Sequence, residues 1–145
     1  MNPLSEFFKE TSNETGVFYP NHYLVAVFRD FTEAETAQQD LTSAGFLSEN
    51  VIAVPGEEVV RFAESHLLKD GLWGVLMREV SRSIGTEAAY ADRDLAAAKS
   101  GAAFVAVRCS DEKLKDKAWR SLEPRRPLAA RYYSSGGIEH LTGEL

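Results

Sequence analysis

Cysteine is almost absent from this chain, since Cys109 is the only one among its 145 residues. A single thiol cannot form an intrachain disulfide, and such a chain fits a reducing compartment. Hydrophobic runs are short as well, because none approaches the roughly 18 apolar residues of a membrane-spanning helix. The first residues lack a basic segment followed by an apolar one, so no secretory signal is predicted. Together these absences predict a cytoplasmic protein without a membrane partner.

Positive charge is also scarce: 16 Lys and Arg stand against 22 Asp and Glu, which gives a net charge of -6. Nucleic acids and anionic membrane surfaces are bound through clustered Lys and Arg, so this balance argues against both. The run from Ser100 to Val107 overlaps a strand signature of RNA-recognition motifs. It lacks the leading basic residue and the aromatic rings that stack on bases. We therefore expect no nucleic-acid partner.

Motifs that carry chemistry are missing too. The chain contains no glycine-rich phosphate loop and no Gly-x-Ser-x-Gly nucleophile turn. The three histidines, His22, His66 and His140, are far apart and lack metal-ligand spacing. Strand alternation separates Cys109 from Arg108, so we interpret Cys109 as an inert buried thiol. We expect no catalytic residue, no metal and no cofactor, and we favour a protein that is not an enzyme.

The residues that are present indicate a globular protein, with 44% hydrophobic and 26% charged residues. Residues 1–21 read as an N-terminal arm, with four aromatic residues among polar ones and Gly16 and Pro20 as breaks. We expect the arm to dock on its own domain or, alternatively, on a partner. Residues 22–145 are predicted to form a single domain.

The first half of that domain reads as a strand–helix–strand unit. A strand is predicted over residues 23–29, and the capping box from Thr32 to Glu35 then begins a helix. Gly45 is a natural helix stop. A second strand follows over residues 50–54, parallel to the first because the crossover connection is right-handed.

The second half repeats this order. A strand over residues 101–109 is followed by Ser110, Asp111 and Glu112, which provide a cap for a helix. The helix buries Leu114, Ala118 and Leu122 and ends at Pro124. A fourth strand is predicted over residues 128–133, and residues 134–137 read as a flexible join to the last segment.

A helical insertion at about residues 57–100 lies between the two units. Its amphipathic stripes include Val59 and Val60 in the first stretch, Trp73 in the second, and Asp94 with Ala98 in the third, which starts at Thr86. The order predicts an α+β, ferredoxin-like sandwich with a four-stranded sheet, βαβ–(helical insertion)–βαβ. Both long helices then cover one face.

The other face of the sheet needs a cover of its own. We expect Tyr132, Val107, Val27 or their neighbours to line it, which would leave a large apolar patch on a monomer. The inserted helices, the arm or another subunit could cover it. This need makes a homo-oligomer, such as a dimer, attractive.

Several of these segments resemble the heat-induced general-stress-protein family of bacteria. They are Val-Ala-Val-Phe at 25–28, Thr-Glu-Ala-Glu at 32–35, Ala44-Gly45-Phe46, and the helix from Glu87 to Gly101 leading into Phe104-Val105-Ala106-Val107. The resemblance spans about residues 23–133. Between 62 and 80 this chain has bulky residues where the family carries a Gly- and Ala-rich segment. The resemblance implies the fold and a stress-related context, and it supplies no catalytic residues.

One polar cluster remains, near the fourth strand: Arg131, Tyr132, Tyr133 and His140 are candidate ligand-binding residues, with Arg125 and Arg126 close by. The simpler interpretation, which we favour, is that the arginines flank a strand and the tyrosines fill an edge. Our leading hypothesis is a non-enzymatic domain that acts by self-association or through a protein partner, with the arm and the inserted helices as interface. The alternative is a small-molecule sensor with its site at a subunit interface. An enzyme that uses an open sheet face is a third hypothesis.

Overall fold

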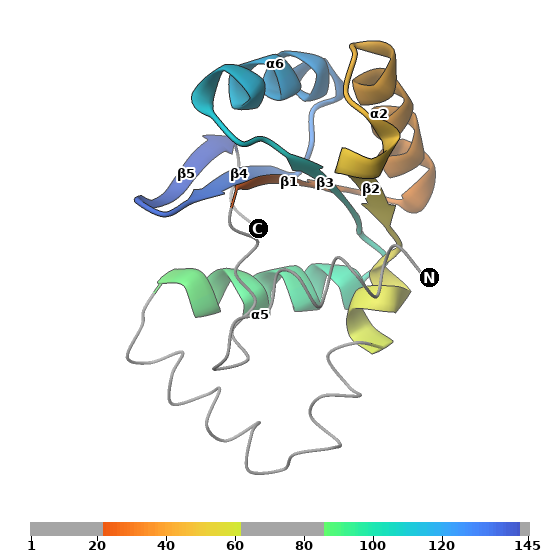
Figure 1. Ribbon diagram of the computed structural model, residues 1–145. Helices are drawn as coiled ribbons and strands as arrows, with labels where there is room; N and C mark the ends of the chain where they lie inside the picture. The colour runs from red at the N-terminus through yellow and green to blue at the C-terminus, as the bar shows by residue number, and fades with distance from the viewer. Residues whose placement is uncertain (1–21, 62–85, 143–145) are drawn as a thin grey trace.

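The computed structural model describes residues 22–61 and 86–142 (Figure 1). The predicted arm at 1–21 and the predicted helices between 62 and 85 lie outside the described residues. The elements, in chain order, are β1 (Tyr23–Phe28), α2 (Phe31–Ser43), η1 (Ser48–Asn50), β2 (Val51–Val54), a helix over residues 56–61, α5 (Thr86–Lys99), β3 (Ala103–Arg108), α6 (Glu112–Leu122), η2 (Glu123–Arg125), β4 (Ala129–Ser134) and β5 (Gly137–Thr142).

All five strands form one sheet in the order β2-β3-β1-β4-β5, and every neighbouring pair is antiparallel. β1 and β3 are central, and nearly all of their residues are buried on both faces, which fits their uninterrupted runs of aliphatic and aromatic residues. β1 and β2 both run antiparallel to β3, so they are parallel to each other as predicted. The α+β class is confirmed.

The predicted number of strands is wrong, because the sheet has five strands rather than four. The segment read as a flexible join is a two-residue turn at Ser135 and Gly136 that leads directly into β5. Gly137 has a φ of 132°, which only glycine adopts easily, and the Ser134 hydroxyl donates to its carbonyl at 3.2 Å. Glycines that looked like a linker therefore form a tight hairpin.

The predicted helix ends are correct at Gly45, at Asp111 and at the Thr86 start of α5, whereas α6 ends at Leu122, just before the predicted Pro124. Gly45 follows the end of α2 with a φ of 110°, and the Asp111 carboxylate accepts from Leu114 N at 2.9 Å to cap α6. The predicted Thr32 cap is wrong, since Thr32 lies inside α2. Asp30, with extended backbone, accepts from Glu33 N at 2.9 Å instead. The helix cap therefore lies two residues before the predicted one, and a carboxylate rather than a hydroxyl provides it.

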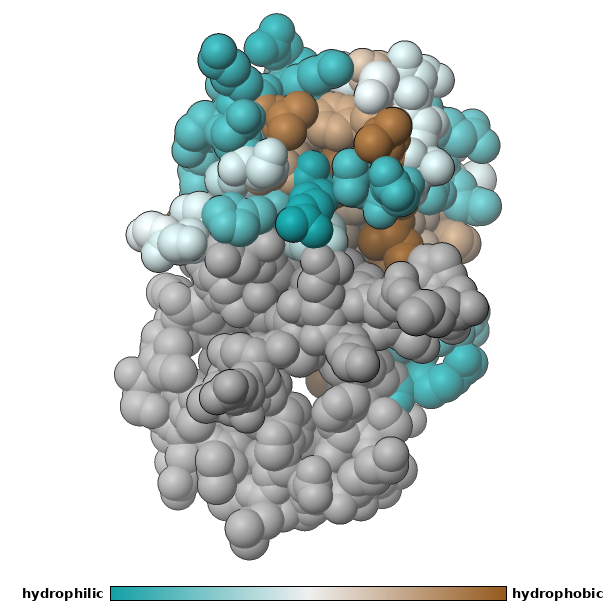
Figure 2. Space-filling view, viewed as in Figure 1, coloured by the Kyte–Doolittle hydropathy of each residue, from teal (hydrophilic) through white to brown (hydrophobic). Residues whose placement is uncertain are grey.

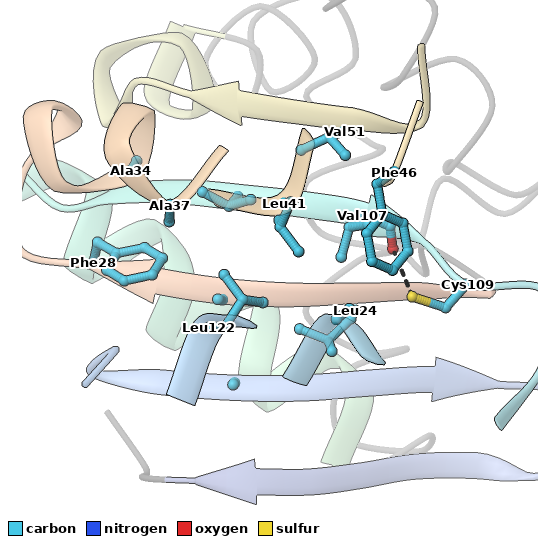
Figure 3. Packing of buried hydrophobic residues seen from close by; sticks show 14 of the residues in the cluster. Leu24, Phe28, Ala34, Ala37, Leu41, Phe46, Val51, Val107, Cys109 and Leu122 are labelled. Carbon is cyan, nitrogen blue, oxygen red and sulfur yellow. Dashed lines mark hydrogen bonds between the residues drawn. The ribbon is translucent and has the colours of Figure 1, made fainter. Parts of the chain in front are cut away.

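Helices cover both faces of the sheet. α2 and α6 lie on one face and α5 lies on the other (Figure 1). Beneath α2 and α6, buried side chains from the strands and helices pack together, including Leu24, Phe28, Leu41, Val107 and Leu122 (Figure 3). Figure 2 shows hydrophobic atoms between α6 and α2, with hydrophilic side chains around them.

The predicted composition of the second face is wrong for two of its three residues. Tyr132 and Val107 belong to the cluster beneath α2 and α6, whereas Val27 belongs to the cluster on the α5 side. These three residues come from different strands, and the sequence does not show how the strands are aligned. A shift of one residue in a strand moves its side chains to the opposite face of the sheet. Ala98 of α5 and, as partly buried residues, Val59, Val60 and Ala97 pack on the α5 side. Inserted helices therefore cover this face, at least in part.

Among the described helices, none is both long enough and apolar enough to span a bilayer.

Candidate functional site

The four candidate ligand residues lie in the β4–β5 hairpin but do not share one face. Arg131 and Tyr133 are buried on the α5 side, and Tyr132 is buried on the α6 side. His140 is exposed on β5, in register with Arg131. The sheet thus separates Tyr132 from Arg131 and Tyr133, because successive side chains of a strand alternate. Ligand binding at these residues stays a prediction.

Arg131 forms a buried ion pair with Asp94 of α5. Its Nη2 lies 2.6 Å from Asp94 Oδ1 and 2.5 Å from Oδ2, with Arg131 2% and Asp94 8% exposed. The Tyr133 ring centroid is 5.8 Å from the guanidinium carbon. Burial raises the pKa of Asp94, and the hydrogen bonds and charge of Arg131 oppose this shift. This pair ties α5 to the centre of β4.

Sequence reasoning placed Asp94 on the apolar side of its helix but assigned it no role. Asp94 lies one helical turn before Ala98, on the same side of the helix. This position could have indicated an ion pair, because a carboxylate on a buried helix face needs a cationic partner. The partner could not be named without the fold, since Arg131 is 37 residues away.

A second cluster on the opposite face joins α6 to β5. Lys115 is 5% exposed, and its Nζ lies 2.6 Å from both Glu139 Oε1 and Glu112 Oε2. Burial lowers the pKa of Lys115, but the hydrogen bonds and charges of Glu112 and Glu139 outweigh burial and raise it. The same ammonium is 5.7 Å from the Tyr132 ring centroid. Sequence reasoning missed Lys115, although it shares a helix face with Ala118 and Leu122, at the spacing i, i+3, i+7.

Tyr132 and Cys109 lie close to this cluster. The Tyr132 hydroxyl donates to the Cys109 carbonyl at 2.7 Å, and the Cys109 thiol donates to the Val107 carbonyl at 3.6 Å. Burial, the largest cause, raises the pKa of Cys109 to about 12. The predicted burial of Cys109 is confirmed, and its thiol is protonated at neutral pH.

A groove of about 590 Å³ lies where α2, the helix over 56–61 and the end of α5 meet. The helix over 56–61 begins very close to the segment that follows α5. Gly56 makes this close approach possible, because a Cβ at this position would lie 2.1 Å from the Ala102 carbonyl oxygen. Arg61 on the groove wall pairs with Glu58 at 2.6 Å. Both signs of charge occur around the groove, which is lined by Phe31, Pro55, Gly56, Glu57, Val60, Arg61, Ala98, Lys99 and Gly101.

The two edges of the sheet differ in protection. β2 has four residues, is followed by Pro55, and its Val51 carbonyl accepts from the Gln38 amide at 3.5 Å. β5 has six residues and contains no Pro, Lys or Arg. Within residues 22–61 and 86–142, no strand pairs with the outer side of β5. As far as the described residues go, β5 is therefore the less protected edge.

Metal-binding chemistry has no support in the described ranges, where no three His, Cys, Asp or Glu side chains gather as a ligand set.

No protein-family model, no curated protein and no solved structure matches this chain.

Proposed function

We propose that this protein is a non-enzymatic α+β domain that acts through self-association or a protein partner. The observation that carries the proposal is the outer edge of β5, six residues long, with which no strand within residues 22–61 and 86–142 pairs. An exposed strand edge presents unpaired backbone donors and acceptors, which another strand can satisfy. The protection of β2 at the opposite edge makes β5 the favoured side.

The buried charges support an interaction role over a catalytic one. Arg131 and Asp94 hold α5 on one face, and Lys115 and Glu139 hold α6 to β5 on the other. Each pair joins a helix to a strand, so these charged groups stabilise the packing of the helices on the sheet. The buried Cys109 thiol, with its raised pKa, is a poor nucleophile at neutral pH.

We further propose the ferredoxin-like fold, a cytoplasmic location and a stress-related context. The strand order supports the fold: β1 and β2, linked through α2, are separated by β3, and β3 and β4, linked through α6, are separated by β1. Two interleaved β–α–β units of this kind form the split arrangement of ferredoxin-like domains, with β5 added at one edge. The stress context depends on the sequence resemblance. A rise in the protein's level after a heat shift would support it, and an unchanged level would contradict it.

Light scattering of the full chain over a range of concentrations tests the main proposal. We expect the mass of a dimer or larger assembly, or a monomer that forms a stoichiometric complex with one protein from its source cells. A monomer at every concentration, with no protein retained on the immobilised chain, would contradict it. A ligand-dependent rise in thermal stability of that monomer would favour the sensor alternative instead.

A further inference from the structure

We infer that β5 pairs antiparallel with the β5 of a second copy of this chain, joining two five-stranded sheets into one. This inference rests on the proposed function, since it names the partner and the contact. The resulting interface is isologous, with the same strand contributed by both subunits. Three properties of β5 support a second copy as the occupant.

The first property is that the sequence of β5 itself carries little of the usual protection against strand pairing, and no described strand covers its outer side. Natural sheet edges are shielded by short strands, prolines, lysines or covering side chains. β2 has such protection, because it is short, precedes Pro55 and receives a hydrogen bond from Gln38. β5 runs for six residues without a proline or a basic residue. The register shift of β4 against β5 lies at Ala130 and Arg131, near the end of the strand, and leaves its first four residues regularly paired.

The second property is charge compensation. Glu139 is the only acidic residue of β5, and Lys115 of the same chain lies 2.6 Å from it. Lys115 also contacts Glu112 at 2.6 Å and Asp116 at 3.5 Å, and it stays in direct contact with the edge carboxylate of Glu139. Two copies of β5 can therefore approach without two uncompensated carboxylates meeting. On the other face His140 is exposed, and it lies in register with the Arg131–Asp94 pair.

The third property is a half-covered apolar side chain on each face. Ile138 packs against the cluster on the α5 side, and Leu141 packs against the cluster beneath α2 and α6. Both are only partly buried, because β5 is the last strand of the sheet. A second β5 brings an Ile138 and a Leu141 of its own to the same two faces. A copy of the chain thus supplies apolar cover on both sides of the sheet.

The two-fold symmetry of such a dimer predicts which residues of the two β5 strands lie opposite each other. A two-fold axis perpendicular to the sheet relates two antiparallel edge strands and keeps each face on its own side. Residues opposite each other must then share a face, so one residue of β5 lies opposite its own copy. The Cβ atoms of such a pair lie about 4.5–5.5 Å apart. A single cysteine at that position faces the same cysteine of the partner.

The experiment introduces one additional cysteine into the full chain, in turn at Ile138, Glu139, His140 and Leu141, and treats each variant with a short thiol cross-linker. The native Cys109 can stay, because it is buried and protonated. Lys113→Cys, on the exposed side of α6, is the control. We expect covalent dimer to be strongest at one β5 position, weaker at its neighbours, and at background level for the control.

A matched pair of edge variants provides the second measurement. Ile138→Lys on β5 and Ile52→Lys on β2 each place a lysine at a partly buried isoleucine on the α5 side of an edge strand. We expect both variants to keep the circular dichroism of the wild type. Only Ile138→Lys should lower the mass measured by light scattering to that of a monomer.

The outcomes separate the inference from the proposed function. A dimer that cross-links at none of the four β5 positions, or that survives Ile138→Lys in a folded chain, overturns the β5 pairing and leaves self-association standing. A monomer that binds a different protein also overturns the pairing but keeps the proposed function. A monomer without any protein partner overturns both.

Discussion

The two faces of the sheet differ in the ion pair that accompanies their apolar side chains. On the α2–α6 face, large apolar side chains such as Leu24, Phe28 and Leu122 are completely buried. On the α5 face, the contact of α5 combines the small side chain of Ala98 with the Arg131–Asp94 ion pair. Both faces bury apolar side chains and each carries a described ion pair, but Arg131 and Asp94 under α5 are both buried, whereas Glu139, the partner of Lys115 on the α6 face, is exposed.

This difference predicts different roles for the two layers. Burial of apolar area is the dominant favourable term in folding, so the α2–α6 face should provide most of the stability. A buried ion pair contributes little net stability, because desolvation of both charges offsets their attraction. It penalises any arrangement that separates the partners, and we therefore expect Arg131 and Asp94 to fix the position of α5. The predictions below test this division.

Phe28→Ala should give the largest loss. Phe28 is fully buried beneath α2 and α6, so its truncation removes apolar contacts and leaves a cavity. We expect the free energy of unfolding to fall by about 3–5 kcal/mol, measured by urea denaturation. A fall below about 1 kcal/mol, as for an ordinary surface change, would show that this face does not dominate stability.

Asp94→Leu should cost nearly as much, for a different reason. The substitution leaves the Arg131 guanidinium buried without its carboxylate, and breaking such a pair costs about 3–5 kcal/mol. The double variant Asp94→Leu with Arg131→Met removes both charges and should recover most of the loss. If the double variant is as unstable as the single one, the ion pair contributes stability as well as position, and the contrast between the faces fails.

Gly56→Ala tests the close approach of the helix over 56–61 to the end of α5. The added methyl group would lie 2.1 Å from the Ala102 carbonyl oxygen and 2.8 Å from that of Ala98, so the backbone must move. We expect a loss of about 1–3 kcal/mol in thermal or urea unfolding. Gly136→Ala in the β4–β5 turn is the control, since its nearest neighbour atom is 3.8 Å away. Equal losses in the two variants would contradict close packing at Gly56.

Cys109 should have the smallest effect at neutral pH and a visible one in alkali. Burial raises its thiol pKa from 9.0 to about 12, so the unfolded chain ionises first as the pH rises. The stability from the protonated buried thiol is complete below about pH 9 and is lost as the pH approaches 12. We expect the difference in free energy of unfolding between wild type and Cys109→Ala to be constant below about pH 9 and to shrink as the pH rises toward 12. A constant difference throughout would contradict the raised pKa.

Much of the fold was predictable because local patterns agree with the tertiary structure. The runs that became β1 and β3 are apolar over their whole length, since central strands are buried on both faces. The Gly45 stop and the Asp111 cap depend on backbone geometry within a few residues, so they could be predicted from neighbours alone. β5 was missed because half-exposed Gly-Ile-Glu-His-Leu-Thr has a weak alternation and two glycines before Ile138.

The candidate site was less predictable. Arg131, Tyr132 and Tyr133 are adjacent in sequence, and they looked like one cluster until strand alternation placed Tyr132 on the opposite face. The partners of the buried charges were invisible, because Asp94 is 37 residues from Arg131 and Glu139 is 24 residues from Lys115. Such pairs depend on how elements stack, which no short pattern encodes.

By itself, the sequence determined four of the five strands, the helices after β1 and β3, and the α+β class, because hydrophobic period, caps and turn residues act over a few positions. The tertiary structure decided the strand register, the face of each side chain, the ion pairs that hold α5 and α6, and which strands form the two edges of the described sheet. These features depend on contacts between distant segments, where a shift of one residue exchanges the buried face for the other.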